Sequence, residues 1–103
     1  MDIEDLIEGQ EFWGVLGELV IDPATNRRRV RTLSGQVVPA GLFVECSKSI
    51  RTRSALHTIF KINVGVSRKP VGRLYLRSLR KEQLLTVGEW DGQYGGKSAK
   101  ARF

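Results

Sequence analysis

The chain has 103 residues, a length that fits one domain with a modest core. Its hydrophobic content of 41% and charged content of 27% are ordinary for a soluble globular domain, and no apolar run approaches the ~18 residues that a membrane-spanning helix needs. A single cysteine excludes an intrachain disulfide. Together with an acidic N-terminus that is unlike a signal peptide, it favours a cytoplasmic location without membrane association.

Charge is divided unevenly along the sequence. Residues 1–22 contain seven Asp and Glu and no Lys or Arg, whereas residues 23–103 contain all seventeen Lys and Arg and four acids. The formal charges of the two segments are therefore −7 and +13. Such asymmetry predicts a polyanionic partner for the basic segment. The alternative is that the acidic segment folds onto the basic one and neutralises it.

The N-terminal segment predicts a short helix followed by a long strand. Residues 2–8 have aliphatic residues at helical spacing, with Asp2 as a suitable N-cap. Residues 11–21 read as a strand that is apolar on both faces. Gly14 and Gly17 would permit a bulge in this strand, the usual device for bending it around a small barrel.

A turn and a basic strand follow. The sequence DPATN at residues 22–26 predicts a type I turn. Residues 27–33 predict a strand with Val30 facing the core. Alternation then directs Arg29 and Arg31 outward.

The middle of the chain predicts short strands and a loop. Strands are expected at residues 36–38 and 42–46. Residues 47–54, SKSIRTRS, are mostly polar and predict a mobile loop that carries Arg51 and Arg53.

Residues 58–78 have the clearest pattern in the chain, that of a β-hairpin. Apolar residues alternate with mostly polar ones in both arms, so one face is expected in the core. The other face is expected to be exposed and to carry Lys61, Asn63, Arg73, Tyr75 and Arg77. The connection between the arms adds Arg68 and Lys69.

The C-terminal part predicts a helical turn at residues 79–85 and a last strand at 86–90. Residues 1–90 then form a single domain, and residues 91–103 a flexible basic tail. The fold class predicted is mainly β: a small SH3-like or OB-like barrel of five to six strands with a short N-terminal helix. A small α+β sheet is the alternative.

The sequence contains no catalytic motif. Cys46 and His57 are the one conceivable Cys–His pair, and no orienting signature accompanies them. Cysteine and histidine each occur once, and no carboxylate cluster has ligand spacing, so no metal site is predicted. We expect a protein that is not an enzyme and has no cofactor and no small-molecule substrate.

The basic residues predict nucleic-acid binding, to DNA or RNA, through an arginine-rich face that holds the phosphate backbone. Arginine, which grips phosphate with a fork of donors and stacks on bases, makes up most of the cations. Tyr75 is the one aromatic residue assigned to an exposed sheet face. The expected binding residues are Arg29, Arg31, Arg51, Arg53, Lys61, Arg68, Lys69, Arg73, Tyr75 and Arg77.

The alternative function is a protein–protein interaction or oligomerisation module, such as an adaptor for an acidic partner. A homodimer is compatible with both functions, because a two-fold axis can place two copies of the arginine face on one surface.

Overall fold

A computed structural model of the protein describes residues 2–70, 72, 74–79 and 84–87. The elements in chain order are a 3-10 turn η1 (Ile3–Asp5), β1 (Glu11–Asp22), β2 (Arg27–Thr32), β3 (Phe43–Glu45), α1 (Lys48–Arg53), β4 (Ile59–Arg68), β5 (Leu74–Ser78) and β6 (Leu85–Thr86). The mainly β class is confirmed. The predicted tail at 91–103 lies outside the described residues, as do most of the predicted helical turn at 79–85 and the end of the predicted last strand.

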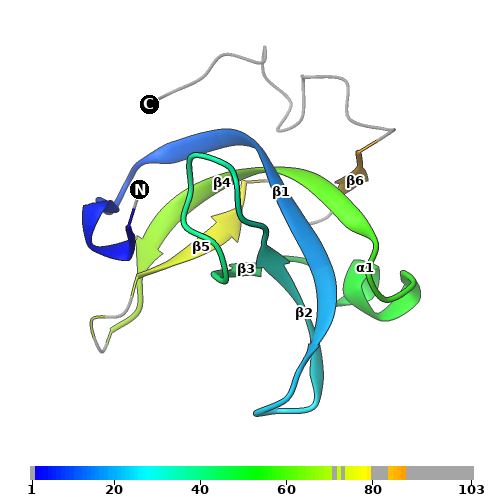
Figure 1. The fold of residues 1–103 in the computed structure, drawn as a ribbon. Coiled ribbons are helices and arrows are strands. Elements are labelled where there is room, and N and C mark those ends of the chain that lie inside the picture. The colour runs from blue at the N-terminus through cyan, green and yellow to red at the C-terminus, as the bar shows by residue number, and fades with distance from the viewer. Residues whose placement is uncertain (1, 71, 73, 80–83, 88–103) are drawn as a thin grey trace.

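The strands form one mixed sheet, and five of them close into a ring (Figure 1). The order is β1-β2-β3-β5-β4, and β1 also pairs with β4, while β6 adds to the outside of the ring on β4. Every pairing is antiparallel except that between β3 and β5, which is parallel. β4 and β5 form the predicted hairpin. β3 pairs with the edge of β5 that faces away from β4.

A bulge lets β1 bend from one neighbour to the other, as the sequence predicts. The register between β1 and β4 shifts between Phe12 and Val15, and Gly14 has a φ of 72°. Buried Asn63 of β4 accepts a hydrogen bond from the backbone N–H of Gly14 at 2.9 Å. The prediction that Asn63 lies on an exposed face was therefore wrong, because this part of β4 faces the bulge and its amide group satisfies the bulged backbone.

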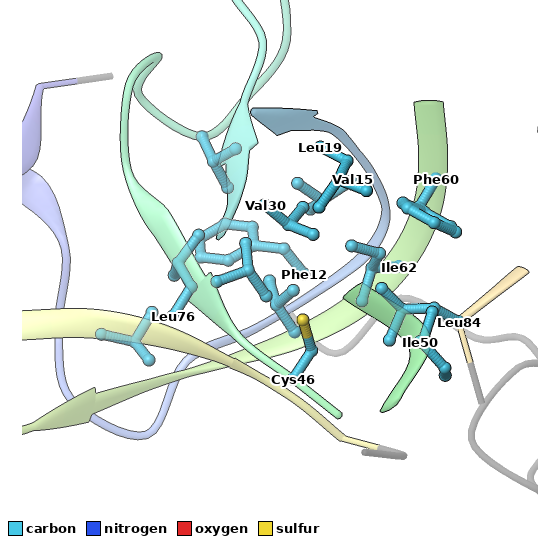
Figure 2. Close-up of a cluster of buried hydrophobic side chains, with 14 of the residues drawn as sticks. Phe12, Val15, Leu19, Val30, Cys46, Ile50, Phe60, Ile62, Leu76 and Leu84 are labelled. Atoms are coloured by element: carbon cyan, nitrogen blue, oxygen red, sulfur yellow. The ribbon is translucent and has the colours of Figure 1, made fainter. Parts of the chain in front are cut away.

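The core occupies the interior of the ring (Figure 2). Its inward-facing strand residues include Phe12, Val15, Leu19, Val30, Val44, Phe60, Ile62, Val64, Val66 and Leu76. Ile50 of α1, Cys46 and Leu84 join the same cluster. The inward face predicted for the hairpin is confirmed, since Phe60, Ile62 and Leu76 are at most 2% exposed.

The prediction of a mobile loop at residues 47–54 was wrong, because this segment contains the helix α1. Ile50 is 5% exposed and packs into the core, and the N–H of Ser54 donates to the carbonyl of Ile50 at the end of the helix. Packing of this one aliphatic side chain gives a six-residue helix the tertiary support that such short helices require.

Two other local predictions need correction. The predicted strand at residues 36–38 is irregular, and the Gln36 side chain hydrogen-bonds both the N–H and the carbonyl of Leu16 in β1. The predicted helix at 2–8 is reduced to the three-residue turn η1, from which Leu6 alone of the aliphatic residues enters the core. Within the described residues, no helix is long and apolar enough to cross a membrane.

Candidate nucleic-acid interface

The outside of the ring carries an ordered row of side chains across β2, β3, β5 and β4. Arg31 lies opposite Phe43, and Tyr75 lies opposite Ser67. β3 and β5 are parallel, and Val44 is paired with Leu76. The preceding residues of the two strands, Phe43 and Tyr75, therefore lie side by side. The row therefore reads arginine, phenylalanine, tyrosine and serine, each from a different strand.

A second row of side chains lies two residues further along β3 and β5. Glu45 of β3 pairs with Arg77 of β5, and Arg77 lies opposite Gly65 of β4. Arg29 occupies the corresponding position on β2, two residues from Arg31. We call the surface formed by the following six residues the outer face: Arg29, Arg31, Phe43, Lys69, Tyr75 and Arg77.

Both aromatic rings of the outer face have a cation over them. The guanidinium carbon of Arg29 is 4.1 Å from the ring centroid of Phe43, and the Lys69 ammonium is 4.8 Å from that of Tyr75. Both distances are within the ~6 Å typical of cation–π contacts. Phe43 was missed as a site residue, although alternation along the predicted strand at residues 42–46 sets it on the opposite side from its neighbour Val44, which is buried.

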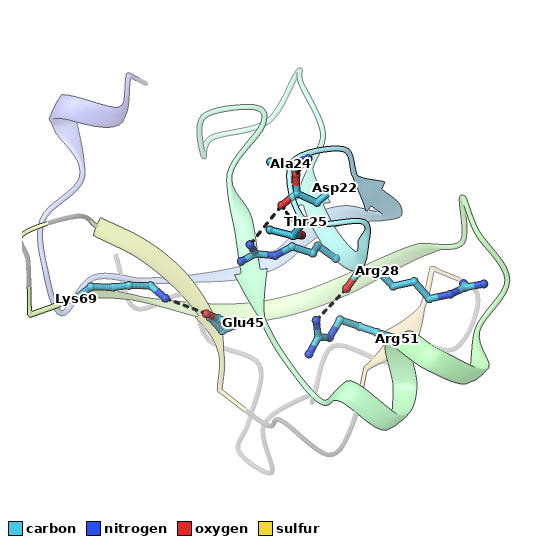
Figure 3. A network of polar contacts seen from close by, with 8 residues as sticks. Asp22, Ala24, Thr25, Arg28, Glu45, Arg51 and Lys69 are labelled. Carbon is cyan, nitrogen blue, oxygen red and sulfur yellow. Dashed lines mark hydrogen bonds and ion pairs between the residues drawn. The ribbon is translucent and has the colours of Figure 1, made fainter.

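Carboxylates hold two of these cations in place. The Arg29 guanidinium lies 3.7 Å from Asp22, and the Lys69 ammonium lies 3.2 Å from Glu45 (Figure 3). Asp22 is also fixed in the β1–β2 turn, where it accepts hydrogen bonds from the Ala24 N–H and the Thr25 hydroxyl. The acids therefore orient the cations over the rings and offset part of their charge.

Arg31 and Arg77 flank the aromatic pair and are exposed. Arg31 lies opposite Glu18 of β1, and the Nε of Arg77 donates a hydrogen bond to Ser67 Oγ at 2.9 Å. Two arginines are thus placed at the sides of a two-ring platform.

The other predicted binding residues do not share this face. Arg51 and Arg53 belong to α1, and Lys61 is half-buried on β4 beyond the Asn63 position. Arg68 lies at the end of β4, where it pairs with Glu8 at 3.6 Å and donates a hydrogen bond to the carbonyl of Gly72. Arg73 lies outside the described residues.

Cys46 and His57 have separate structural settings. Burial raises the pKa of the Cys46 thiol from its usual 9.0 to about 11, so this group stays protonated at neutral pH. His57 is exposed, and its Nδ1 lies 2.8 Å from a carboxylate oxygen of Glu18. Among the described residues, no group of three or more His, Cys, Asp or Glu is arranged to hold a metal ion.

Comparisons with protein-family models, with curated proteins and with solved structures find no match to this chain.

Proposed function

We propose that the five-stranded ring is an OB-like barrel and that its outer face binds single-stranded nucleic acid without catalysing a reaction. The closed order β1-β2-β3-β5-β4 and the helix between β3 and β4 favour the OB-like over the SH3-like alternative. OB-like barrels bind oligonucleotides on the β2–β3 face and on the β1–β2 and β4–β5 connections. Arg29, Arg31 and Phe43 of the outer face lie on β2 and β3, and Lys69 lies in the β4–β5 connection, while Tyr75 and Arg77 extend the face onto β5.

The observation that carries the proposal is the row in which Phe43 and Tyr75 stand side by side between Arg31 and Ser67, with Arg77 hydrogen-bonded to Ser67. Aromatic rings offer stacking platforms for unpaired bases, at about 1–3 kcal/mol per base. A base that stacks on Phe43 or Tyr75 displaces the cation over that ring, and the cation then contacts the phosphates. A duplex presents phosphates and hides its base faces, so it would leave both rings unused.

The ion pairs on the outer face do not prevent phosphate binding. Arg29 and Lys69 each have a carboxylate partner, and the Lys69–Glu45 pair is partly exposed on both sides. An exposed pair such as Lys69–Glu45 contributes about 0–1 kcal/mol, so a phosphate can compete with Glu45 for Lys69, whereas buried Asp22 keeps its hold on Arg29. The carboxylates would position the cations in the unbound protein.

The direct test is the affinity of the full chain for labelled 12-nucleotide single strands of DNA and RNA, measured by fluorescence anisotropy at low salt. Phe43→Leu and Tyr75→Leu keep apolar side chains but remove the rings. We expect the double variant to bind at least ten-fold more weakly, because two stacking contacts are lost.

Val37→Ala is the matched control, since Val37 is an exposed apolar residue in the irregular segment before β3 and lies outside the outer face. It should leave the affinity unchanged. Equal affinities of the wild type and the Phe43→Leu, Tyr75→Leu variant would refute stacking as the mode of binding.

A second candidate is self-association through the same face. Glu45 and Lys69 are both partly exposed and opposite in charge, so a two-fold rotation would place Glu45 of one copy against Lys69 of the other. Light scattering across a hundred-fold range of protein concentration tests this candidate. A monomer at every concentration would exclude it, and a dimer abolished by Glu45→Lys would favour it.

A further inference from the structure

A second group of cations lies between α1 and the start of β2, away from the aromatic row. A cavity of about 250 Å³ there is lined by Arg27, Arg28, Lys48, Arg51 and Thr52. We call it the α1–β2 basin. Pockets for drug-sized ligands are usually 300–1,000 Å³ and lined mainly by apolar and aromatic residues. The basin is smaller, and four of its five lining residues are cationic, so its chemistry suits a compact anion.

Two of its guanidinium groups are fixed by reciprocal bonds between the strand and the helix. Arg28 Nη1 donates to the carbonyl of Ser54 at the end of α1, at 3.0 Å. Arg51 Nη1 of α1 donates to the carbonyl of Arg28 in β2, at 2.9 Å (Figure 3). These bonds hold both guanidinium groups at the basin. The two positive charges therefore stay close together, although they repel each other.

Donors remain after these bonds are made. A guanidinium group carries five N–H donors, and each of the two bonds uses one of them. The Nε of Arg51 is buried and has no hydrogen-bond partner among the described residues.

The cations of the basin also lack acidic partners in the part of the chain that the structure describes. The ion pairs there join Asp22 to Arg29, Glu18 to His57, Glu8 to Arg68 and Glu45 to Lys69. None involves Arg27, Arg28, Lys48 or Arg51. Asp22 lies opposite Arg27 in the strand register but is paired with Arg29, so the four cations repel one another and a bound anion would relieve that repulsion.

We propose that the α1–β2 basin binds a phosphate group. Arg28 of β2 and Arg51 of α1 present guanidinium groups that backbone bonds hold in place, and exposed Arg27 and Lys48 complete the cationic lining. The phosphate belongs either to a nucleic-acid strand or to a free polyphosphate. The basin does not depend on the outer face, since none of its residues belongs to that face.

The test uses inorganic tripolyphosphate titrated into the full chain and followed by ¹H–¹⁵N NMR. We expect saturable shifts concentrated at the amides of residues 27, 28, 48, 51 and 52. The double variant Arg27→Gln, Lys48→Gln should bind at least ten-fold more weakly. Both side chains are exposed, so the fold should tolerate the change.

The matched control is Arg53→Gln combined with Arg68→Gln. It removes the same charge from exposed positions that neither line the cavity nor belong to the outer face. Tripolyphosphate affinity should then fall no more than two-fold. An equal loss in the control, or shifts spread over the whole surface, would overturn the proposal in favour of a general charge effect.

Two further arms identify the source of the phosphate. A several-fold loss of single-strand affinity in the Arg27→Gln, Lys48→Gln variant assigns the basin to a strand phosphate, whereas loss of tripolyphosphate affinity alone assigns it to a free phosphate compound. Phe43→Leu with Tyr75→Leu should leave tripolyphosphate binding unchanged. Failure of single-strand binding would therefore refute the outer face and still leave the basin supported by its own titration.

Discussion

Gly17 of β1 leaves the space that a buried valine on β2 fills. A Cβ at position 17 would lie 2.6 Å from Cγ1 of Val30, a side chain that is 0% exposed. We expect Gly17→Ala to lower the free energy of unfolding by about 1–3 kcal/mol, because the core must shift to admit the methyl group. Urea denaturation measures this change.

The cause can be separated from a general effect of replacing glycine. Val30→Ala removes the obstructing methyl group, so Gly17→Ala should cost less in that background than in the wild type. Losses that simply add in the double variant would show that the contact with Val30 is not the reason.

Cys46 makes a prediction about alkaline pH. Burial raises its pKa, an effect that Arg51 and Arg29 partly oppose. The folded thiol therefore holds its proton to higher pH than the unfolded thiol, so its contribution to stability is complete below pH 9 and is lost as the pH rises to about 11. At ~1.4 kcal/mol per pKa unit, the loss is about 2–3 kcal/mol.

Cys46→Ala serves as the reference for this measurement, because Lys and Tyr also titrate in that range. Urea denaturation of both proteins between pH 8 and 11 should show a steeper decline for the wild type. Parallel declines would contradict the assigned cause.

Individual residues also show what strand alternation can predict. It placed Arg29 and Arg31 outside the ring, and the same rule applied to Leu42–Cys46 would have found Phe43. It failed at Asn63, because a bulge on the neighbouring strand closes over that part of β4 and the sequence does not reveal where two distant strands meet.

At the scale of elements, α1 shows most clearly where sequence reasoning stops. Six residues with three cations and one aliphatic side chain have no reason to be helical alone. Contacts distant in sequence form the helix: Ile50 enters the core, and Arg28 and Arg51 bond α1 to β2. None of these contacts can be read from local composition, whereas the hairpin and the β1–β2 turn carry their own patterns.

Ile50 is therefore expected to anchor α1. Ile50→Ala should lower the free energy of unfolding by about 2–4 kcal/mol, because it empties a buried site and detaches the helix. Ser49→Ala, at an exposed neighbouring position, should change it by less than ~0.5 kcal/mol. Hydrogen exchange should speed up at α1 before the strands do. Uniform exchange along the chain would argue against a locally anchored helix.

At the scale of the whole molecule, the acidic segment meets the basic one at specific places. Glu8 pairs with Arg68, Glu18 lies opposite Arg31, and Asp22 pairs with Arg29. The closure of the ring by β3 and β5 joins residues that are 32 positions apart, such as Glu45 and Arg77, and so could not be predicted from the sequence. The acidic segment and the basic face are thus neighbours in one sheet.

This arrangement predicts weak local masking. Glu18→Gln should raise single-strand affinity about two- to five-fold at low salt, because Glu18 lies opposite Arg31 of the outer face and such a cross-strand pair contributes at most ~1 kcal/mol. Glu4→Gln removes an equal charge from an exposed position that has no ion-pair partner among the described residues, and it should have a smaller effect. Equal effects would mean that net charge alone is responsible.

The central claim is that single strands bind to the outer face by stacking and by phosphate contacts together. The most direct measurement is single-strand affinity as a function of salt for the wild type, for Phe43→Leu with Tyr75→Leu, and for Arg31→Gln with Arg77→Gln. Each phosphate contact should contribute about −0.7 to the slope of log affinity against log salt.

The aromatic variant should lose affinity at every salt concentration and keep the wild-type slope. The arginine variant should have a slope that is shallower by about 1 to 2 units. No detectable binding at low salt, or a duplex bound as tightly as a single strand by both the wild type and the aromatic variant, would contradict the account.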